Sequence, residues 1–192
     1  MIRPIEYDKD EVLKAATELF WKKGYELVSM NELVEVTGLN KHSMYDIFGN
    51  KSGLFSAALK HYCDSAPDEI KQLSNKPYGI DSIEKYLRFL AEYAGSEDCI
   101  GCLVINTIVE NEQVDDGVVK VAEEHIHEMR KDIEKNLKSA QNQKNISSDK
   151  NCRDLANYII CFIQGMMVSG KMETCADNMN KLVDTVISTL RR

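Results

Sequence analysis

The sequence predicts an all-α protein of about nine helices, and two observations carry this prediction. Apolar residues recur at three- and four-residue steps in successive segments, which is the period of a helix that packs on one face. Capping residues and glycines lie between these segments, where helices would begin and end. The sequence contains no strand-like alternation of any length, no internal repeat and no low-complexity tract. We therefore expect three short helices followed by a larger helical body.

The first helix is expected to follow Asp8 or Asp10 and to end near Lys23, before Gly24. Its apolar residues share one helical face, and they are Val12, Ala15, Ala16, Leu19 and Phe20. This spacing is typical of a helix that packs against a core on one side and contacts solvent on the other.

The stretch SMNELVEVTGLNKHSMYDIFGNKSGLF, residues 29–55, predicts two short helices joined by a tight turn and the start of a third. Ser29 is a suitable N-cap, and Glu32 lies three residues later, which completes a capping box. Gly38 is expected to end the first of these helices, because glycine adopts a left-handed conformation without the steric cost of a Cβ atom.

The next two helices also have identifiable starts. Asn40 is expected to cap a helix over about residues 41–48, and Asn50 to cap a helix that begins at Lys51. Two short helices on either side of a glycine-containing turn are typical of the helix-turn-helix, which reads DNA with its second helix. We therefore predict a helix-turn-helix head over residues 1–50 and a helical body over residues 51–192.

Six helices are expected in the body. They cover about residues 51–73, 81–94, 99–110, 118–137, 152–172 and 177–190. Residues 158–168 are apolar on all sides of a helix, so this segment should be buried on more than one face.

Composition bounds the class of protein. A chain of 192 residues, 43% of them hydrophobic, can form one domain or two small ones. No apolar run approaches the roughly 18 residues that a membrane helix requires, so we expect no membrane partner. The segment MIRPIEYDKDE is too acidic and polar for a signal peptide, which favours a cytoplasmic protein. In that compartment the six cysteines should be mostly thiols.

The charge distribution does not identify a nucleic-acid binder by itself. The net charge is −7, but residues 1–60 carry 8 Lys and Arg against 9 Asp and Glu, so the acidic excess lies in the remainder. Phosphate contacts require local positive charge and backbone donors rather than a basic protein as a whole. A head this close to neutral is expected to have low non-specific affinity for DNA.

Residues 12–55 resemble the DNA-binding domain of the TetR family of bacterial transcriptional repressors. The matching positions follow the spacing of the family without a gap, and they are Ala15, Ala16, Leu19, Phe20, Gly24, Tyr25, Ser29, Gly38, Lys41, Tyr45, Phe48, Lys51, Leu54 and Phe55. The resemblance implies a homodimeric repressor that binds a near-palindromic operator in double-stranded DNA. It also implies release by a small-molecule effector bound in the body.

The resemblance places the helix over residues 41–48 in the major groove. Lys41 and Tyr45 are then expected to contact phosphates and nearby bases, because an ammonium and a phenol hydroxyl both donate to phosphate. His42 and Ser43 are expected to reach base edges. The alternative is that Tyr45 packs against the first helix and that Lys41 is a solvated surface lysine.

Ser29 and Lys51 lie at helix N-termini, where free N–H groups and the helix dipole favour phosphate binding. Ser29 would also serve as a cap, and the two roles are compatible. Asp46 departs from the family pattern, which more often has a neutral or basic residue there. It would either repel phosphate or accept a hydrogen bond from cytosine N4, and the sequence leaves both open.

For the body, the resemblance implies an effector pocket and a dimer surface. The pocket candidates are Phe89, Tyr93, Ile105, Asn106, Met129, Phe162 and Met166. The alternative is that these side chains are ordinary core. The dimer surface is expected on the last two helices, including the apolar stripe over residues 182–190.

Cys99 and Cys102 form a CxxC motif at the start of the expected helix over residues 99–110. A helix N-terminus favours a thiolate, so this pair could act as a redox or electrophile sensor. The alternative is two structural cysteines. A structural zinc would require two further ligands and no second CxxC is present, so no metal or other cofactor is expected.

The sequence contains no glycine-rich phosphate loop, HExxH or GxSxG motif, which argues against an enzyme. Two alternatives to a regulator remain. The first is a helical small-molecule-binding protein or enzyme whose head only resembles a helix-turn-helix and which has no operator. The second is a structural interaction protein that binds neither DNA nor a ligand.

Overall fold

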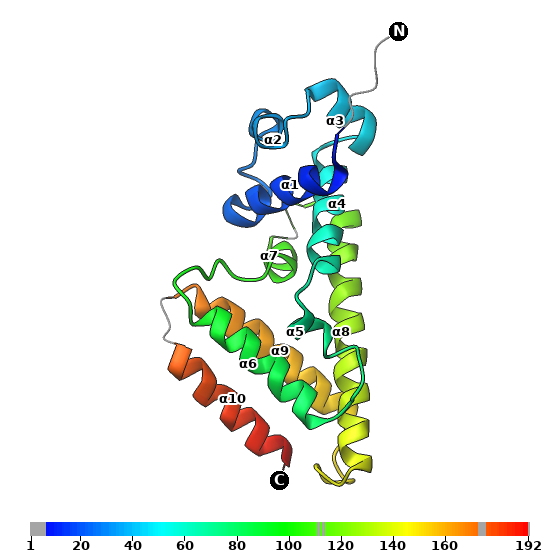
Figure 1. The fold of residues 1–192 in the computed structure, drawn as a ribbon, viewed down its shortest axis with the longest axis vertical. Coiled ribbons are helices and arrows are strands. Elements are labelled where there is room, and N and C mark those ends of the chain that lie inside the picture. Colours follow the sequence, from blue (N-terminus) through cyan, green and yellow to red (C-terminus); the bar gives the residue numbers. More distant parts are fainter. Residues whose placement is uncertain (1–6, 111, 113, 173–175, 192) are drawn as a thin grey trace. The chain divides into compact units, whose positions relative to one another are not determined.

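The computed structural model describes residues 7–110, 112, 114–172 and 176–191, and within these residues the chain is all-α with no strand (Figure 1). The ten helices are α1 (Lys9–Lys23), α2 (Met30–Thr37), α3 (Lys41–Phe48), α4 (Lys51–Asp64), α5 (Asp68–Lys71), α6 (Ile80–Ala94), α7 (Leu103–Val109), α8 (Asp116–Asn142), α9 (Cys152–Gly170) and α10 (Ala176–Arg191). The predicted fold class is confirmed.

The tenth helix arises because the expected helix over residues 51–73 is interrupted. α4 ends at Asp64, and the four-residue α5 follows Pro67. A proline disfavours the helical conformation of the residue before it, here Ala66, and this accounts for the break. α7 also begins later than expected, at Leu103, so Cys102 is its N-cap rather than part of its first turn.

The chain divides into two compact units. The head unit consists of Met1–Ser65 and Cys102–Glu123, and the body unit consists of Ala66–Gly101 and Glu124–Arg192. α8 therefore contributes its first turns to the head unit and the rest to the body unit. These compact units differ from the predicted division between residues 50 and 51. That division concerns where DNA binding and effector binding are separated, and it stays a prediction.

The core of the head unit forms where α1 packs against α4. The rings of Phe20 and Phe55 lie 4.6 Å apart between centroids, and both side chains are almost fully buried. The buried hydroxyl of Thr17 donates to the Ala58 carbonyl at 3.1 Å, so this polar group is satisfied inside the core. These contacts fix α1 on α4.

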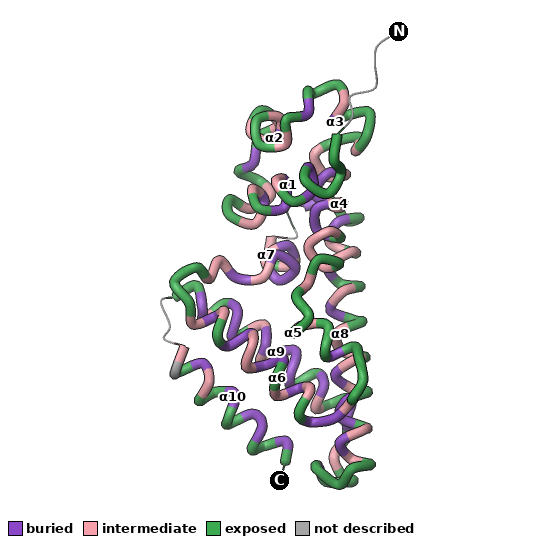
Figure 2. The backbone as a smooth tube through the Cα atoms, in the orientation of Figure 1, coloured by how far each residue is buried: buried purple, intermediate pink, exposed green. Residues whose placement is uncertain are grey.

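In the body unit, α6 packs against both α9 and α10. Its buried residues follow the helical period, and Figure 2 shows the buried positions as a regular band along α6 and α9. Asn136 of α8 is fully buried, where its side-chain amide donates to the Leu73 carbonyl at 2.7 Å and accepts from the Gly79 N–H at 3.0 Å. This amide holds the segment between α5 and α6 against α8.

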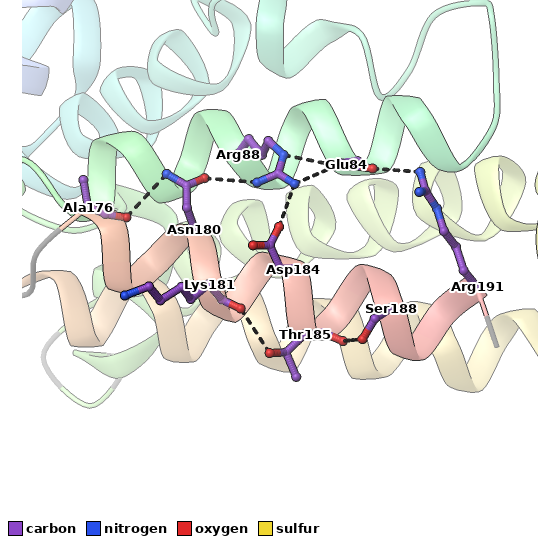
Figure 3. A network of polar contacts seen from close by, with 9 residues as sticks. All are labelled: Glu84, Arg88, Ala176, Asn180, Lys181, Asp184, Thr185, Ser188 and Arg191. Atoms are coloured by element: carbon purple, nitrogen blue, oxygen red, sulfur yellow. Dashed lines mark hydrogen bonds and ion pairs between the residues drawn. The ribbon is translucent and has the colours of Figure 1, made fainter.

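A polar network joins α6 to α10 along one edge of the body unit (Figure 3). The Arg88 guanidinium donates to Glu84 at 2.7 Å and to Asp184 at 2.8 Å, and Arg191 donates to Glu84 at 2.9 Å. These side chains are partly exposed, so each ion pair contributes little to stability alone. Together they fix the orientation of α10 on α6.

α10 has a buried and an exposed face. Val183, Val186, Ile187 and Leu190 are buried within the protomer, whereas Leu182 is 47% exposed. Most of the stripe over residues 182–190 therefore packs on the protomer's own core, so only its exposed side chains, such as Leu182, are available to a dimer surface on the last two helices. Among the helices of the described residues, none has the combination of length and apolar character that would let it cross a bilayer.

Candidate DNA interface

The start of α2 is fixed by the capping box that the sequence predicts. The Ser29 hydroxyl accepts from the Glu32 N–H at 3.3 Å, and the Glu32 carboxylate accepts from the Ser29 N–H at 2.9 Å. Lys23 of α1 also donates to the Glu32 carboxylate. These bonds, that from Lys23 first, lower the pKa of Glu32 to about 2.

The turn between α2 and α3 depends on Gly38, whose φ of 70° and ψ of 0° lie in the left-handed region. Asn40 then caps α3 as predicted, because its side-chain oxygen accepts from the Ser43 N–H at 2.9 Å. Met44 is only 1% exposed and anchors the inner face of α3 in the head core. The start of α3 is thus determined by local sequence.

Anchoring α3 through Met44 leaves its opposite face in solvent. Lys41, His42, Tyr45 and Asp46 are all exposed, and Tyr45 has an exposed fraction of 47%. In the structure, Tyr45 therefore faces solvent and is not buried against α1, as the alternative required. Ser43, the remaining predicted base contact on α3, is half-buried, so less of its side chain is presented to solvent.

Asp46 lies one helical turn after His42, with its carboxylate oxygen 3.4 Å from His42 Nε2. Both side chains are well exposed, so the pair is open to solvent and to a DNA partner. When His42 is protonated, it compensates the negative charge that Asp46 adds to this face.

Lys51 has a structural role in addition to the predicted phosphate contact. Its ammonium lies 4.4 Å from the centroid of the Tyr25 ring and donates to the Glu26 carbonyl at 3.2 Å. Partial burial lowers the pKa of Lys51. Lys51 therefore connects the start of α4 to the segment between α1 and α2.

The end of α7 contributes an unexpected contact to the same segment. Glu110 accepts a hydrogen bond from the Tyr25 N–H at 3.3 Å. Burial and then the nearby carboxylate of Asp115 raise the pKa of Tyr25, because both disfavour a phenolate. No sequence pattern connects two residues 85 positions apart, so sequence reasoning missed Glu110.

The predicted effector residues are divided between the two units. Ile105 and Asn106 lie on α7 of the head unit, and the body unit contains Phe89 and Tyr93 on α6, Met129 on α8, and Phe162 and Met166 on α9. Ile105 and Met166 are buried, and the other five are half-buried.

Two of the body-unit candidates have polar contacts in the protomer itself. The Tyr93 hydroxyl donates to the Gly101 carbonyl at 3.1 Å, and it also accepts from the Ile100 N–H. The Met129 sulfur accepts a hydrogen bond from the Tyr86 hydroxyl. The assignment of these residues to an effector pocket stays a prediction.

The cysteine environments bear on the predicted sensor pair. Burial raises the pKa of Cys102 even though backbone N–H groups of α7 and the Tyr62 hydroxyl, 3.7 Å from its sulfur, act in the opposite direction. Burial and then the proximity of Cys102 raise the pKa of Cys63 to about 12. The thiolate form expected at this helix start is thus disfavoured by burial, and the sensing role stays a prediction.

Within the described parts of the chain, no three His, Cys, Asp or Glu side chains lie together as metal ligands would. A short helix that presents an exposed polar face after a tight glycine turn, on a three-helix scaffold, defines a helix-turn-helix DNA-binding protein.

Comparison with known proteins identifies the family. Residues 12–58 match the family described as bacterial regulatory proteins, tetR family, and residues 80–186 match the tetracyclin repressor-like C-terminal domain. The chain belongs to the TetR family, and it is a DNA-binding transcriptional regulator.

Several relatives extend over nearly the whole chain. The HTH-type transcriptional repressor ComR of Escherichia coli K12 is 29% identical over 189 residues, which is 96% of this chain and 90% of ComR. A cysteine mutant of the TetR family regulator CifR, solved with 26-bp operator DNA, has a TM-score of 0.78 at 25% identity and covers 98% of this chain and 99% of its own. A TetR family regulator from Agrobacterium tumefaciens has the same fold, with a TM-score of 0.82 at 18% identity over 95% of this chain and 97% of its own.

Proposed function

We propose that the protein is a homodimeric repressor that binds a near-palindromic operator through α3 and dissociates from it when a small molecule binds. The observation that carries this proposal is the exposed face of α3, with Lys41 and Tyr45 presented one helical turn apart above the buried Met44. Relatives named as repressors, and the CifR complex with operator DNA, support it. Since operator DNA lies in the bacterial cytoplasm, we place the protein there.

On DNA, α3 would enter the major groove with its exposed face toward the bases. Lys41 and Tyr45 would then donate to phosphates, and His42 and Ser43 would contact base edges. The N-termini of α2 and α4, at Ser29 and Lys51, would add phosphate contacts from backbone N–H groups. Since the head is close to neutral, affinity would depend on this localised set of donors.

The surface of α9 supports a homodimer. Tyr158, Cys161, Gly165 and Val168 recur at three- and four-residue steps, and all four are exposed although the opposite face of α9 is buried core. Leu182 adds an exposed apolar side chain on α10. A second copy that covered this stripe would bury it, and a near-palindromic operator would require the two reading helices of such a dimer to lie about 34–36 Å apart.

Effector control would follow from differential binding. A small molecule that binds more tightly to the conformation in which the two heads do not fit the operator lowers the affinity of the protein for DNA. The coupling is reciprocal, so bound DNA weakens the binding of the small molecule by the same free energy. The Glu110–Tyr25 hydrogen bond connects the end of α7 to the turn before the helix-turn-helix, so a displaced α7 would act on the head directly.

The experiment that tests the proposal is a binding titration of the full-length protein with the DNA upstream of its own gene. A sequence-specific complex that weakens steeply with added salt is the expected result. The matched control is the same DNA with its near-palindrome scrambled. Equal affinity for both sequences, or no binding at low salt, would favour a small-molecule-binding protein or enzyme without an operator.

A further inference from the structure

Arg130 occupies a position on α8 where the helical pattern calls for an apolar side chain. Ile126 lies four residues before it and Ile133 three residues after it, and they are 9% and 0% exposed. Residues at these spacings share one face of a helix, so Arg130 lies on the core-facing stripe that continues to Leu137 and Ala140. All five residues belong to the body unit.

One donor of the Arg130 guanidinium, the Nε–H, is not satisfied by the protomer, and the residue as a whole is half-buried. Its Nε is buried and has no hydrogen-bond partner among the described residues, where no ion pair of Arg130 is found either. The other cations of the body unit that are not fully exposed differ in this respect. Arg88 pairs with Glu84 and Asp184, and Lys150 donates to carbonyls at the end of α10.

An unsatisfied buried N–H on a guanidinium requires an explanation, because arginine stays protonated and an unpaired buried N–H costs stability. Its planar fork of donors matches a carboxylate or phosphate better than any neutral group. A ligand that brings such an anion would complete the hydrogen bonds of Arg130.

The side chain that precedes Arg130 on α8 indicates the rest of the ligand. The preceding residue, Met129, accepts a hydrogen bond at its sulfur from the Tyr86 hydroxyl at 3.4 Å, and Tyr86 is only 2% exposed. Aromatic and thioether side chains favour contact with an apolar or aromatic group. The acceptor is therefore expected on a molecule whose remaining surface is apolar.

We propose that Arg130 anchors an anionic ligand in the body unit, a small organic acid whose carboxylate binds the guanidinium and whose apolar part contacts the side chains around Tyr86 and Met129. As an effector site, this assignment rests on the proposed effector-controlled function. It gives that function a ligand class, and it makes Arg130 the residue that selects acids over neutral molecules of the same shape.

The test measures thermal unfolding of the full-length protein with benzoate as the probe. Benzamide, which has nearly the same shape but no charge, and sodium chloride at the same ionic strength are the comparisons. Benzoate is expected to raise the unfolding midpoint in a saturable way, as a ligand of the native state does, and the two comparisons are not. A wild-type midpoint that rises no more with benzoate than with benzamide or salt overturns the proposal.

Two variants locate the effect. Arg130→Met is expected to abolish the benzoate shift, and the matched control Lys131→Met is expected to retain it, because Lys131 is exposed and pairs with Glu128 on the surface. Arg130→Lys keeps the charge but not the planar fork, so its shift should be smaller than that of the wild type. An undiminished shift in Arg130→Lys and Arg130→Met overturns the proposal even if one of them is less stable.

Phenyl phosphate separates the two anion chemistries. If it stabilises the wild type and benzoate does not, the carboxylate assignment is wrong. None of these measurements contains DNA, so a failed operator titration and a failed benzoate shift are independent results.

Discussion

The ammonium of Lys51 lies 4.4 Å from the centroid of the Tyr25 ring, so the first residue of α4 packs on the segment between α1 and α2. A cation over an aromatic ring contributes about 0.5–1 kcal/mol at a partly exposed site. We expect Lys51→Ala to lower the stability of the head by about this amount and also to weaken operator binding. Chemical denaturation and a DNA titration of the same sample check both effects, and unchanged stability would contradict the packing role.

Lys41 and Tyr45 are expected to affect DNA affinity alone. Both are exposed, so Lys41→Ala and Tyr45→Phe should leave the thermal midpoint unchanged. Lys41→Ala should reduce the slope of log affinity against log salt by about 1, and loss of the Tyr45 hydrogen bond should weaken binding by about 1 kcal/mol. Lys22→Ala, an exposed lysine of α1, is the control. Wild-type affinity in both α3 variants would remove α3 from the interface.

The exposed stripe of α9 gives a sharper dimer test than the buried positions of α10. Val168 is 49% exposed, so Val168→Asp should fold normally and sediment as a monomer. Ile187→Asp should instead lower the stability of the protomer, because Ile187 is 5% exposed. Lys85→Asp, an exposed position of α6, is the control for charge. A stable Val168→Asp dimer would place the interface on another surface.

Glu32 should make the head depend on pH in acid. Its pKa is lowered to about 2 in the folded protein from an ordinary value of 4.5, so its stabilising contribution is complete above the ordinary value and is lost as the pH falls toward 2. We expect Glu32→Gln to be less stable than the wild type at neutral pH, with the difference shrinking below about pH 4.5. Denaturation at several pH values measures this, with exposed Glu35→Gln as the control. A constant difference would exclude the Lys23–Glu32 pair as its cause.

The cysteines should react in an order set by burial. Cys161 is exposed in the protomer, whereas burial raises the pKa of Cys102 and that of Cys63, so N-ethylmaleimide at neutral pH should modify Cys161 first in the monomeric Val168→Asp variant. Peptide mass analysis over time gives the order. Fast modification of Cys102 in the folded protein, with loss of operator binding that a Cys99→Ser/Cys102→Ser variant lacks, would support the sensor pair instead.

Local features of the head were predictable from the sequence. Each helix cap and the glycine turn depend only on residues within four positions of themselves. All four appear as expected, and they are Ser29, Gly38, Asn40 and Asn50. The break after α4 was also encoded locally, by Pro67, but the apolar period of residues 51–73 obscured it.

Contacts between distant segments were not predictable in this way. Glu110 contacts Tyr25 across 85 positions, and nothing in either local sequence indicates the other. Arg130 had a visible signal, a charged residue at a core position of the α8 stripe, but the stripe was read from its apolar members alone. Burial of Ile187 within the protomer was not predictable either, because an amphipathic pattern does not distinguish a protomer core from a dimer interface.

The head unit draws on two separate segments, residues 1–65 and 102–123, with 66–101 belonging to the body unit. A fragment that ended at residue 65 would lack α7, its Glu110 contact with Tyr25 and its Cys102 contact with Tyr62. A single crossover after α4 between two related regulators would exchange their DNA specificity. It would also join the first four helices of one regulator to the α7 of the other. Chimeras that transfer residues 1–65 and 102–123 together preserve these contacts. Inheritance of the helix-turn-helix is therefore constrained by α7, a helix of the same unit that lies far from it in the sequence.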